Sequence, residues 1–245
     1  MPPRFDTAPP WFRVLLRLED AALYTLRNHL PTQAHLHGDD EATADYALNE
    51  RLGIYAAERM VPGGNASPYM VQHASRYLWA MDICRGKQVV DLGSGDGYGT
   101  LLLSWVARSA VGFDVSEEAV AAARRRYPGV EYRVVDLSDQ TVIPEAEIGV
   151  CFEVVEHVPH AERILYSFGQ RFRRLLLSMP NPIVGGSHIN PHHVNDWPLS
   201  TLRAHLRHAG ATHIRGYHQG LYSWRIRRGA TALHPFWLLD VSFER

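Results

Sequence analysis

The segment Val89-Val-Asp-Leu-Gly-Ser-Gly-Asp-Gly-Tyr-Gly99 constrains the fold more than any other part of this 245-residue chain. It joins a short apolar run, a turn with a glycine at every second position, and the start of an apolar helix at Tyr98. Glycine lets the backbone turn sharply and approach a ligand without a Cβ in the way. A strand, a glycine turn and a helix in this order predict a βα unit with a ligand-binding loop.

The same alternation continues to the end of the chain. Strands are expected at 88–92, 110–113, 130–135, 148–152 and 174–178, with a closing antiparallel pair at 212–217 and 237–243. Helices are expected at 67–84, 98–108, 116–126, 161–170 and 199–209. Alternating strands and helices predict an α/β fold with a doubly wound, mostly parallel sheet. Ligands of such sheets bind beyond the carboxyl ends of the strands.

The N-terminal part of the chain has a different character. Residues 11–30 form an apolar-sided helix that Pro31 ends, and residues 46–60 are expected to form a second short helix. We therefore divide the chain into an N-terminal helical extension and lid at 1–66 and a main domain at 67–245. The first helix offers enough apolar surface for a homodimer.

Charge and cysteine content exclude several classes of protein. Lysine and arginine number 25 against 26 aspartates and glutamates, so no overall field attracts nucleic acid or an anionic membrane. The cysteines are Cys84 and Cys151, too few for a disulfide scaffold or a cysteine zinc site. No apolar run has the length of a membrane span, and the first residues lack the apolar stretch of a signal peptide. We therefore expect a cytoplasmic protein.

An acidic residue lies at the end of each of the first three strands of the main domain. Asp91 ends the first strand, where it suits a ligand that carries an ammonium group. Asp114 ends the second strand, where an acid accepts hydrogen bonds from both ribose hydroxyls. Asp136 follows the third and can accept a hydrogen bond from an adenine amino group. Three acids and a glycine loop indicate an adenosine-containing ligand.

The glycine loop alone does not decide which ligand this is, because such loops also bind NAD and FAD. The spacing Gly93-x-Gly95-x-Gly97 is one residue shorter than the dinucleotide fingerprint, although Gly99 leaves some ambiguity. The acid at the end of the first strand is badly placed for a pyrophosphate. The lysine of a phosphate-binding P-loop is also missing.

Taken together, these residues show that the sequence resembles the class I S-adenosylmethionine-dependent methyltransferases over about 67–243. The matching segments are VVDLGSGDGYG (89–99), VGFDVS (111–116), VVDL (134–137), CFEVVEHV (151–158) and LLLSMPNP (175–182). The resemblance implies a Rossmann-like sheet of seven strands and S-adenosyl-L-methionine as cofactor. Residues 58–77 and 190–199 are similar to a branch of the family that often acts in glycan and secondary-metabolite pathways, and in that branch the first of these segments is a lid.

The resemblance also suggests which residues surround the cofactor. From the strand ends and the glycine loop they are Asp91, Gly93, Ser94, Gly95, Tyr98, Asp114, Val115, Asp136, Leu137 and Glu153. From the lid and the helix after it they are Arg59 and Tyr69, with His73 and Arg76 as further candidates. For these last four, ordinary helix packing is an equally good explanation.

Histidines after the fourth and fifth strands are the candidate catalytic residues. His157 follows the fourth strand, where acceptors meet the methyl group in this fold, and a histidine that titrates near neutral pH can serve as a base. A purely structural role for it is the competing interpretation. His188, His192 and His193 follow the fifth strand in a loop that should cover the acceptor. Their spacing matches no zinc pattern and the chain has 14 histidines, so we expect no metal site.

The preferred function is methyl transfer to a hydroxyl of a small molecule: a sugar, a glycan precursor or a natural product. A nucleic-acid (RNA) methyltransferase is a rival function. However, Asn181-Pro182 follows the fifth strand instead of the fourth and lacks the second proline and the aromatic residue typical of enzymes that methylate base amines. A non-catalytic domain that binds S-adenosylmethionine or a partner protein is a second rival, and an NAD-dependent oxidoreductase is a more distant third.

Overall fold

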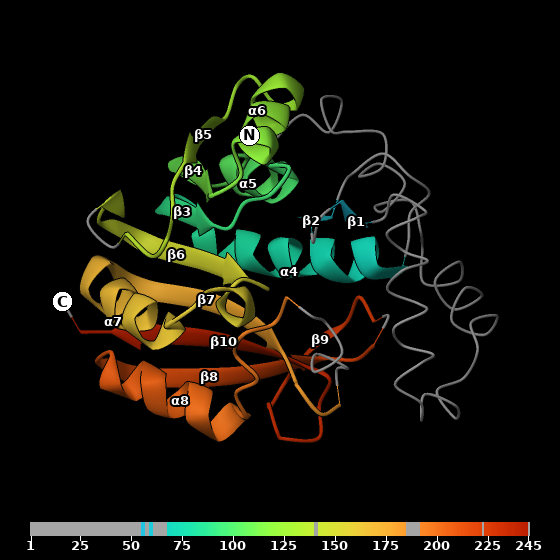
Figure 1. Ribbon diagram of the computed structural model, residues 1–245, viewed down its shortest axis with the longest axis vertical. Coiled ribbons are helices and arrows are strands. Elements are labelled where there is room, and N and C mark those ends of the chain that lie inside the picture. The colour runs from blue at the N-terminus through green and yellow to red at the C-terminus, as the bar shows by residue number, and fades with distance from the viewer. Residues whose placement is uncertain are drawn as a thin grey trace.

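The computed structural model describes residues 55–56, 59–60, 68–139, 142–184, 192–221 and 223–244 (Figure 1). Its main sheet has eight strands in the order β5-β4-β3-β6-β7-β10-β8-β9. The strands are β3 (Gln88–Leu92), β4 (Ser109–Asp114), β5 (Glu131–Val134), β6 (Ala146–Phe152), β7 (Phe172–Pro180), β8 (Ala211–Gln219), β9 (Ile226–Arg228) and β10 (Phe236–Phe243). The helices are α4 (Pro68–Cys84), α5 (Tyr98–Ser104), α6 (Glu117–Arg126), α7 (Ala161–Arg171) and α8 (Leu199–His208), with a 3₁₀ turn η3 (Val155–His157).

The sheet confirms the doubly wound α/β prediction and adds one short strand to it. Strands β5, β4, β3, β6 and β7 are parallel neighbours, so their carboxyl ends share one edge. The predicted closing pair is also present, because β10 runs antiparallel to both β7 and β8 and lies between them. The eighth strand, β9, pairs with β8 over three residues and was not predicted, since so short a segment has no clear apolar pattern.

Side-chain alternation along the central strands divides the core between the two faces of the sheet. Val89 packs in a cluster with residues of α4 and α5, whereas its neighbour Val90 packs in a cluster with residues of α7 and α8. On β7, Leu176 belongs to the first cluster, and Leu175 and Leu177 belong to the second. Successive side chains of a strand point to opposite faces, so strands covered on both sides are apolar throughout. Because helices cover both faces of the sheet, we expect a ligand at the carboxyl edge of the strands.

In the N-terminal part of the chain, the structure tests the expected helices at only a few residues. The helix expected at 11–30, and with it the proposed dimer contact, lies outside the described residues. Within the helix expected at 46–60, the structure instead has two short antiparallel strands, β1 (Tyr55–Ala56) and β2 (Arg59–Met60). The helical prediction is therefore wrong at these positions. No helix in the described part of the chain is long and apolar enough to cross a membrane.

Candidate cofactor and catalytic site

The glycine loop after β3 adopts the backbone conformations that its sequence predicts. Gly93, Gly95 and Gly97 have φ angles of 76°, 51° and 85°, in the left-handed region that favours glycine. A Cβ on Gly93 would lie 2.3 Å from a methyl group of Val154, whereas a Cβ on Gly95 would meet nothing within 4 Å. The loop is therefore packed tightly against the segment after β6 at Gly93 and has open space at Gly95.

Asp114 at the end of β4 connects the glycine loop to helix α6. Its Oδ2 accepts the backbone N–H of Gly95 at 2.8 Å, and its Oδ1 accepts that of Ser116 at 2.9 Å. Ser116 in turn caps α6 by accepting the N–H of Ala119, as its position predicts. A carboxylate oxygen can accept more than one hydrogen bond, so both oxygens retain capacity for ribose hydroxyls. The adjacent Val115 is 65% exposed and offers an apolar surface beside them.

Asp136 and Leu137 follow the next strand, β5, at the same edge. The backbone N–H of Val135 donates to the carbonyl of Asp114 at 2.9 Å, which joins the two strand ends. The side chain of Asp136 is exposed and accepts the N–H of Ser138 at 2.8 Å, whereas Leu137 is buried. The three predicted residues Asp114, Asp136 and Leu137 therefore lie on neighbouring strand ends, as expected.

Asp91 lies beneath the glycine loop, in the core. Its side chain is fully buried and accepts hydrogen bonds from the hydroxyls of Tyr77, at 3.2 Å, and Thr100, at 2.7 Å. Burial raises the pKa of Asp91 to about 7. In this conformation the carboxyl group ties α4 and α5 to β3. Its contact with a ligand ammonium group stays a prediction.

Two further candidates, Tyr98 and His73, form a hydrogen-bonded pair beside this carboxyl group. The Tyr98 hydroxyl bonds the Nδ1 atom of His73, which comes from α4. Burial, and next to it the guanidinium of Arg76, lowers the pKa of His73 to about 3, so its imidazole is neutral at physiological pH. The nearby Ser94, also a predicted contact, has a buried hydroxyl with no hydrogen-bond partner among the described residues.

Glu153 after β6 is part of a buried polar network. Its φ angle is 55°, a conformation that non-glycine residues adopt at a cost and that recurs at functional sites. Its Oε1 accepts the Ser178 hydroxyl at 2.7 Å and pairs with Arg76 at 3.1 Å. The Arg76 Nε donates to Gln219 on β8 at 2.9 Å. From the sequence, no site role was assigned to Gln219 or to Ser178, although Ser178 lies in the LLLSMPNP segment, since their place beside Glu153 depends on the strand order.

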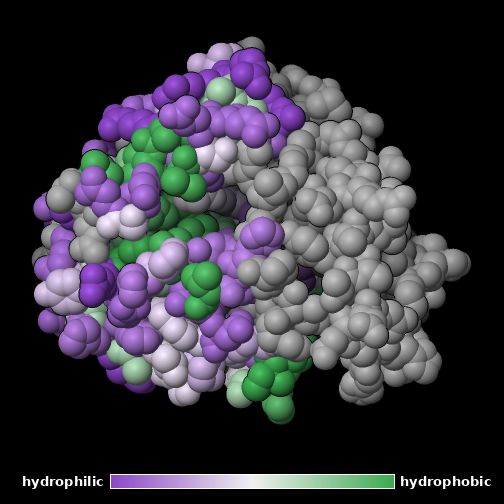
Figure 2. Space-filling view, viewed as in Figure 1, coloured by the Kyte–Doolittle hydropathy of each residue, from purple (hydrophilic) through white to green (hydrophobic). Residues whose placement is uncertain are grey.

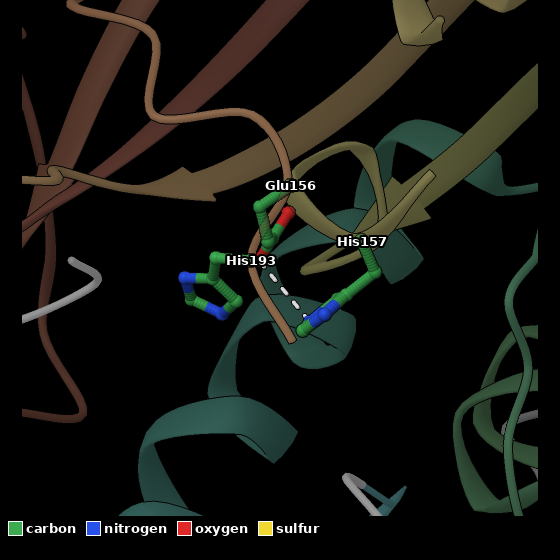
Figure 3. Close-up of side chains that lie close together, drawn as sticks. All are labelled: Glu156, His157 and His193. Carbon is green, nitrogen blue, oxygen red and sulfur yellow. Dashed lines mark ion pairs between the residues drawn. The ribbon is translucent and has the colours of Figure 1, made fainter. Parts of the chain in front are cut away.

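The histidines after β6 and β7 meet at the carboxyl edge (Figure 3). His157 in η3 is half-buried, and its ring centroid lies 4.6 Å from that of His193 in an edge-to-face arrangement. The side chain of His192 is exposed, and His188 lies outside the described residues. Of the three histidines named after the fifth strand, the structure thus brings His193 to His157. Because Val154 contacts the glycine loop, η3 lies next to the candidate cofactor site.

Glu156, between Val155 and His157, is the most unusual group of this edge. It is 1% exposed, and its Oε1 lies 4.0 Å from the Nε2 atom of His157. Burial and the neighbouring Glu153 raise the pKa of Glu156 to about 8. From the sequence, no role was assigned to this residue, although a carboxylate beside a histidine at a strand end is a signal that could have singled it out.

Comparison with known proteins identifies the family. Residues 89–176 match the methyltransferase domain family. A probable S-adenosylmethionine-dependent methyltransferase of Mycolicibacterium smegmatis is 32% identical over 180 residues, which cover 68% of this chain and 68% of the relative. The chain belongs to the S-adenosylmethionine-dependent methyltransferases, and S-adenosyl-L-methionine is its cofactor. A probable methyltransferase of this type from Mycobacterium tuberculosis is 29% identical over 89% of this chain and 81% of its own length.

More distant methyltransferases share parts of the sequence or the fold. A ubiquinone biosynthesis O-methyltransferase of Thiobacillus denitrificans is 34% identical over 30% of this chain and 34% of its own. Among solved structures, a possible histamine N-methyltransferase from Thermotoga maritima aligns with a TM-score of 0.62 and 12% identity, over 83% of this chain and 99% of the other. Magnesium protoporphyrin IX methyltransferase from Synechocystis, with bound S-adenosylmethionine, aligns with a TM-score of 0.55 and 19% identity, over 87% of this chain and 100% of the other. These structural likenesses establish the methyltransferase fold.

The methyltransferase thus has its family motifs on one edge of the sheet. Arg59 and Tyr69 remain predictions, because the structure describes their backbone but not their side chains. On the face viewed in Figure 2, hydrophobic residues gather in a recess surrounded by hydrophilic ones.

Proposed function

We propose that this methyltransferase transfers the methyl group of S-adenosylmethionine to a hydroxyl oxygen of a small molecule, namely a sugar, a glycan precursor or a natural product. The observation that carries the proposal is the position of His157. This half-buried residue lies at the carboxyl edge, three residues after Val154, which packs against Gly93. A hydroxyl is a poor nucleophile while it is protonated, so its methylation needs a group that helps the proton leave. A relative that is itself an O-methyltransferase adds support.

The cofactor-binding roles follow from the positions of the strand ends. We propose that Asp114 receives the ribose hydroxyls, that Asp136 receives the adenine amino group, and that Val115 and Leu137 contact the adenine ring. Gly93, Ser94 and Gly95 present backbone to the ligand without side-chain obstruction, with Asp91, Tyr98 and Glu153 next to them. Arg59 and Tyr69 are proposed to act from the lid at 1–66 and the helix after it. When bound, the cofactor supplies a methyl group on a positively charged sulfur.

The chain's own contribution to the reaction is positioning and activation of the acceptor. Holding the hydroxyl oxygen in line with the methyl carbon and its sulfur supplies much of the rate. His157 activates that hydroxyl, and the loop that carries His192 and His188 covers it. His192 and His188 remain the alternative groups for taking the proton.

Two arrangements in the structure weigh against the nucleic-acid alternative. The side-chain amide of Asn181, which follows the fifth strand, donates to the backbone carbonyls of Ala232 and His234, at 2.8 and 3.0 Å, and is therefore engaged within the fold. In the basic helix end at 124–126, Arg124 donates to the Tyr132 carbonyl and Arg126 pairs with Asp96 at 2.8 Å. Such internally engaged arginines stabilise the fold and offer less to a phosphate backbone.

The test is methyl transfer from S-adenosylmethionine labelled in its methyl group to panels of sugars, hydroxylated natural products, amines, carboxylic acids and RNA. We expect label in a hydroxylated acceptor, in a product that resists mild alkali because it is an ether and not an ester. His157→Ala should lower turnover by about 10²–10⁴-fold while the affinity for S-adenosylhomocysteine is retained. Label only in amines or RNA would refute the proposal.

A further inference from the structure

Three side chains at the carboxyl edge converge although they come from two separate segments. Glu156 and His157 lie in η3, whereas His193 lies between β7 and α8. Each offers one ligand atom, and these atoms all lie within 4.8 Å of one another. Figure 3 shows the carboxylate and the two imidazoles side by side. Each of these groups is a common metal ligand in proteins.

The buried carboxylate has a bonding capacity that the described protein groups leave unused. Glu156 is 1% exposed, yet its Oε2 atom has no hydrogen-bond partner among the described residues. Leaving a buried polar atom without a hydrogen-bond partner destabilises the folded state, and more so for a charged group. A bound cation would remove this cost.

The loop that carries His193 is fixed to η3 by its backbone. The two residues after His193 both donate backbone N–H groups to the carbonyl of Glu156, at 2.8 and 3.2 Å. The side-chain amide of Asn195 also donates to the carbonyls of Val155 and Val158, at 2.8 and 2.7 Å. Four hydrogen bonds therefore hold the two segments together. The backbone therefore keeps the two segments that carry the three side chains next to one another.

We propose that Glu156, His157 and His193 form a binding site for a divalent first-row transition-metal ion such as Zn²⁺ or Co²⁺. Two imidazoles and one carboxylate form a three-residue ligand set of the kind that leaves a coordination position open for substrate. Ligand bonds of roughly 2.0–2.2 Å allow atoms that share an ion to lie up to about 4 Å apart. The 4.0 Å between Glu156 and His157 already meets this limit. The half-buried His193 ring has to move by about 1 Å.

The role of this ion rests on the proposed function. The open coordination position takes the acceptor hydroxyl, and the positive charge lowers the hydroxyl pKa so that its proton is lost to solvent. The oxygen then forms its bond to the methyl carbon as the carbon–sulfur bond breaks, and neutral S-adenosylhomocysteine leaves. His157 activates the hydroxyl in this scheme by holding the ion and does not accept the proton itself.

The experiment uses tag-free, full-length protein that has been stripped of metal with a chelator. Titration with Co²⁺ is followed by visible absorption, and Zn²⁺ affinity is measured by competition with a chromophoric chelator. We expect one equivalent of Co²⁺ with the spectrum of nitrogen and oxygen ligation, displaced by Zn²⁺. His193→Ala should weaken Zn²⁺ binding by at least about tenfold, and Glu156→Gln should do the same.

The matched control is His160→Asn, because His160 is an exposed histidine three residues after His157 and asparagine tolerates its φ of 56°. This variant should bind Zn²⁺ as the unchanged protein does. Wild-type affinity in His193→Ala, or no stoichiometric Co²⁺ binding by the unchanged protein, would overturn the proposal. The methyl-transfer assay on the same protein separates the two proposals. Label in a hydroxylated acceptor without Co²⁺ binding refutes the metal site alone, and circular dichroism establishes that each variant is folded.

Discussion

Replacing Asp114 by alanine tests the placement of the cofactor most directly. In the structure this carboxylate holds the glycine loop and the start of α6 together, through hydrogen bonds of 2.8 and 2.9 Å from the N–H groups of Gly95 and Ser116. In the bound state we expect the same two oxygens to receive the ribose hydroxyls. The substitution therefore removes the acceptors of two backbone N–H groups and, in the bound state, of two ribose hydroxyls. It should lower both the stability of the protein and its affinity for the cofactor.

The magnitudes follow from the number and type of these hydrogen bonds. A hydrogen bond to a charged group contributes about 1.5–3 kcal/mol, so loss of even one of the two ribose contacts should raise the dissociation constant roughly 10- to 150-fold, and this is the smallest effect we expect. The two backbone N–H groups lose acceptors in a partly buried place, which should cost about 1–2 kcal/mol of unfolding free energy. For a chain of this size that corresponds to a fall in Tm of about 2–8 °C.

Isothermal titration calorimetry with S-adenosylhomocysteine measures the affinity, and differential scanning calorimetry measures the stability. The matched control is Asp82→Ala, because Asp82 is an exposed aspartate of α4 that forms a surface ion pair with Arg85 at 3.6 Å. Its affinity should stay within about twofold of the unchanged protein, since surface ion pairs contribute little. If Asp114→Ala binds S-adenosylhomocysteine equally well while folded, the ribose does not lie at the end of β4.

Two other predictions concern the core beneath the glycine loop. Gly93→Ala should destabilise the protein by about 1–3 kcal/mol more than Gly86→Ala in chemical unfolding, because both positions have positive φ but only the Gly93 Cβ would meet Val154; equal losses would show that the loop moves aside. Burial raises the folded-state pKa of Asp91 from 3.8 to about 7, so the unfolded chain loses this proton at lower pH than the folded one. Stability should therefore fall as the pH rises between about 4 and 7, and Asp91→Asn should flatten this part of the stability profile measured by urea unfolding.

The sequence determined the fold class because its signals were local. Apolar runs of strand length, helices with one apolar side and glycines at fixed positions each follow from a few neighbouring residues. The carboxyl ends of parallel strands share an edge, so Asp114 and Asp136 could be assigned to one edge of the sheet without coordinates. The Ser116 cap was predictable for the same reason, since an N-cap bonds a backbone group three residues later. The weakly patterned segment around β1 and β2, by contrast, was wrongly expected to be helical.

Tertiary structure decided everything that depends on contact between distant segments. Asp91 alternates into the core, so its carboxyl group bonds Tyr77 and Thr100 beneath the loop, a placement that its position at a strand end did not indicate. The Arg76–Glu153 pair joins residues far apart in the sequence. His157 meets His193 because hydrogen bonds between two loops bring their segments together, and the spacing of the histidines along the chain did not indicate this.

Sequence by itself therefore determined the α/β fold, the resemblance to the family and the edge of the sheet on which the candidate cofactor residues lie, because these follow from short-range patterns, local motifs and the geometry of parallel strands. Only the tertiary structure decided which polar groups are buried, which acids have a raised pKa, and which histidine joins Glu156 and His157. The physical reason is that burial and side-chain contact depend on how segments far apart in the chain pack together, and no local pattern encodes that packing.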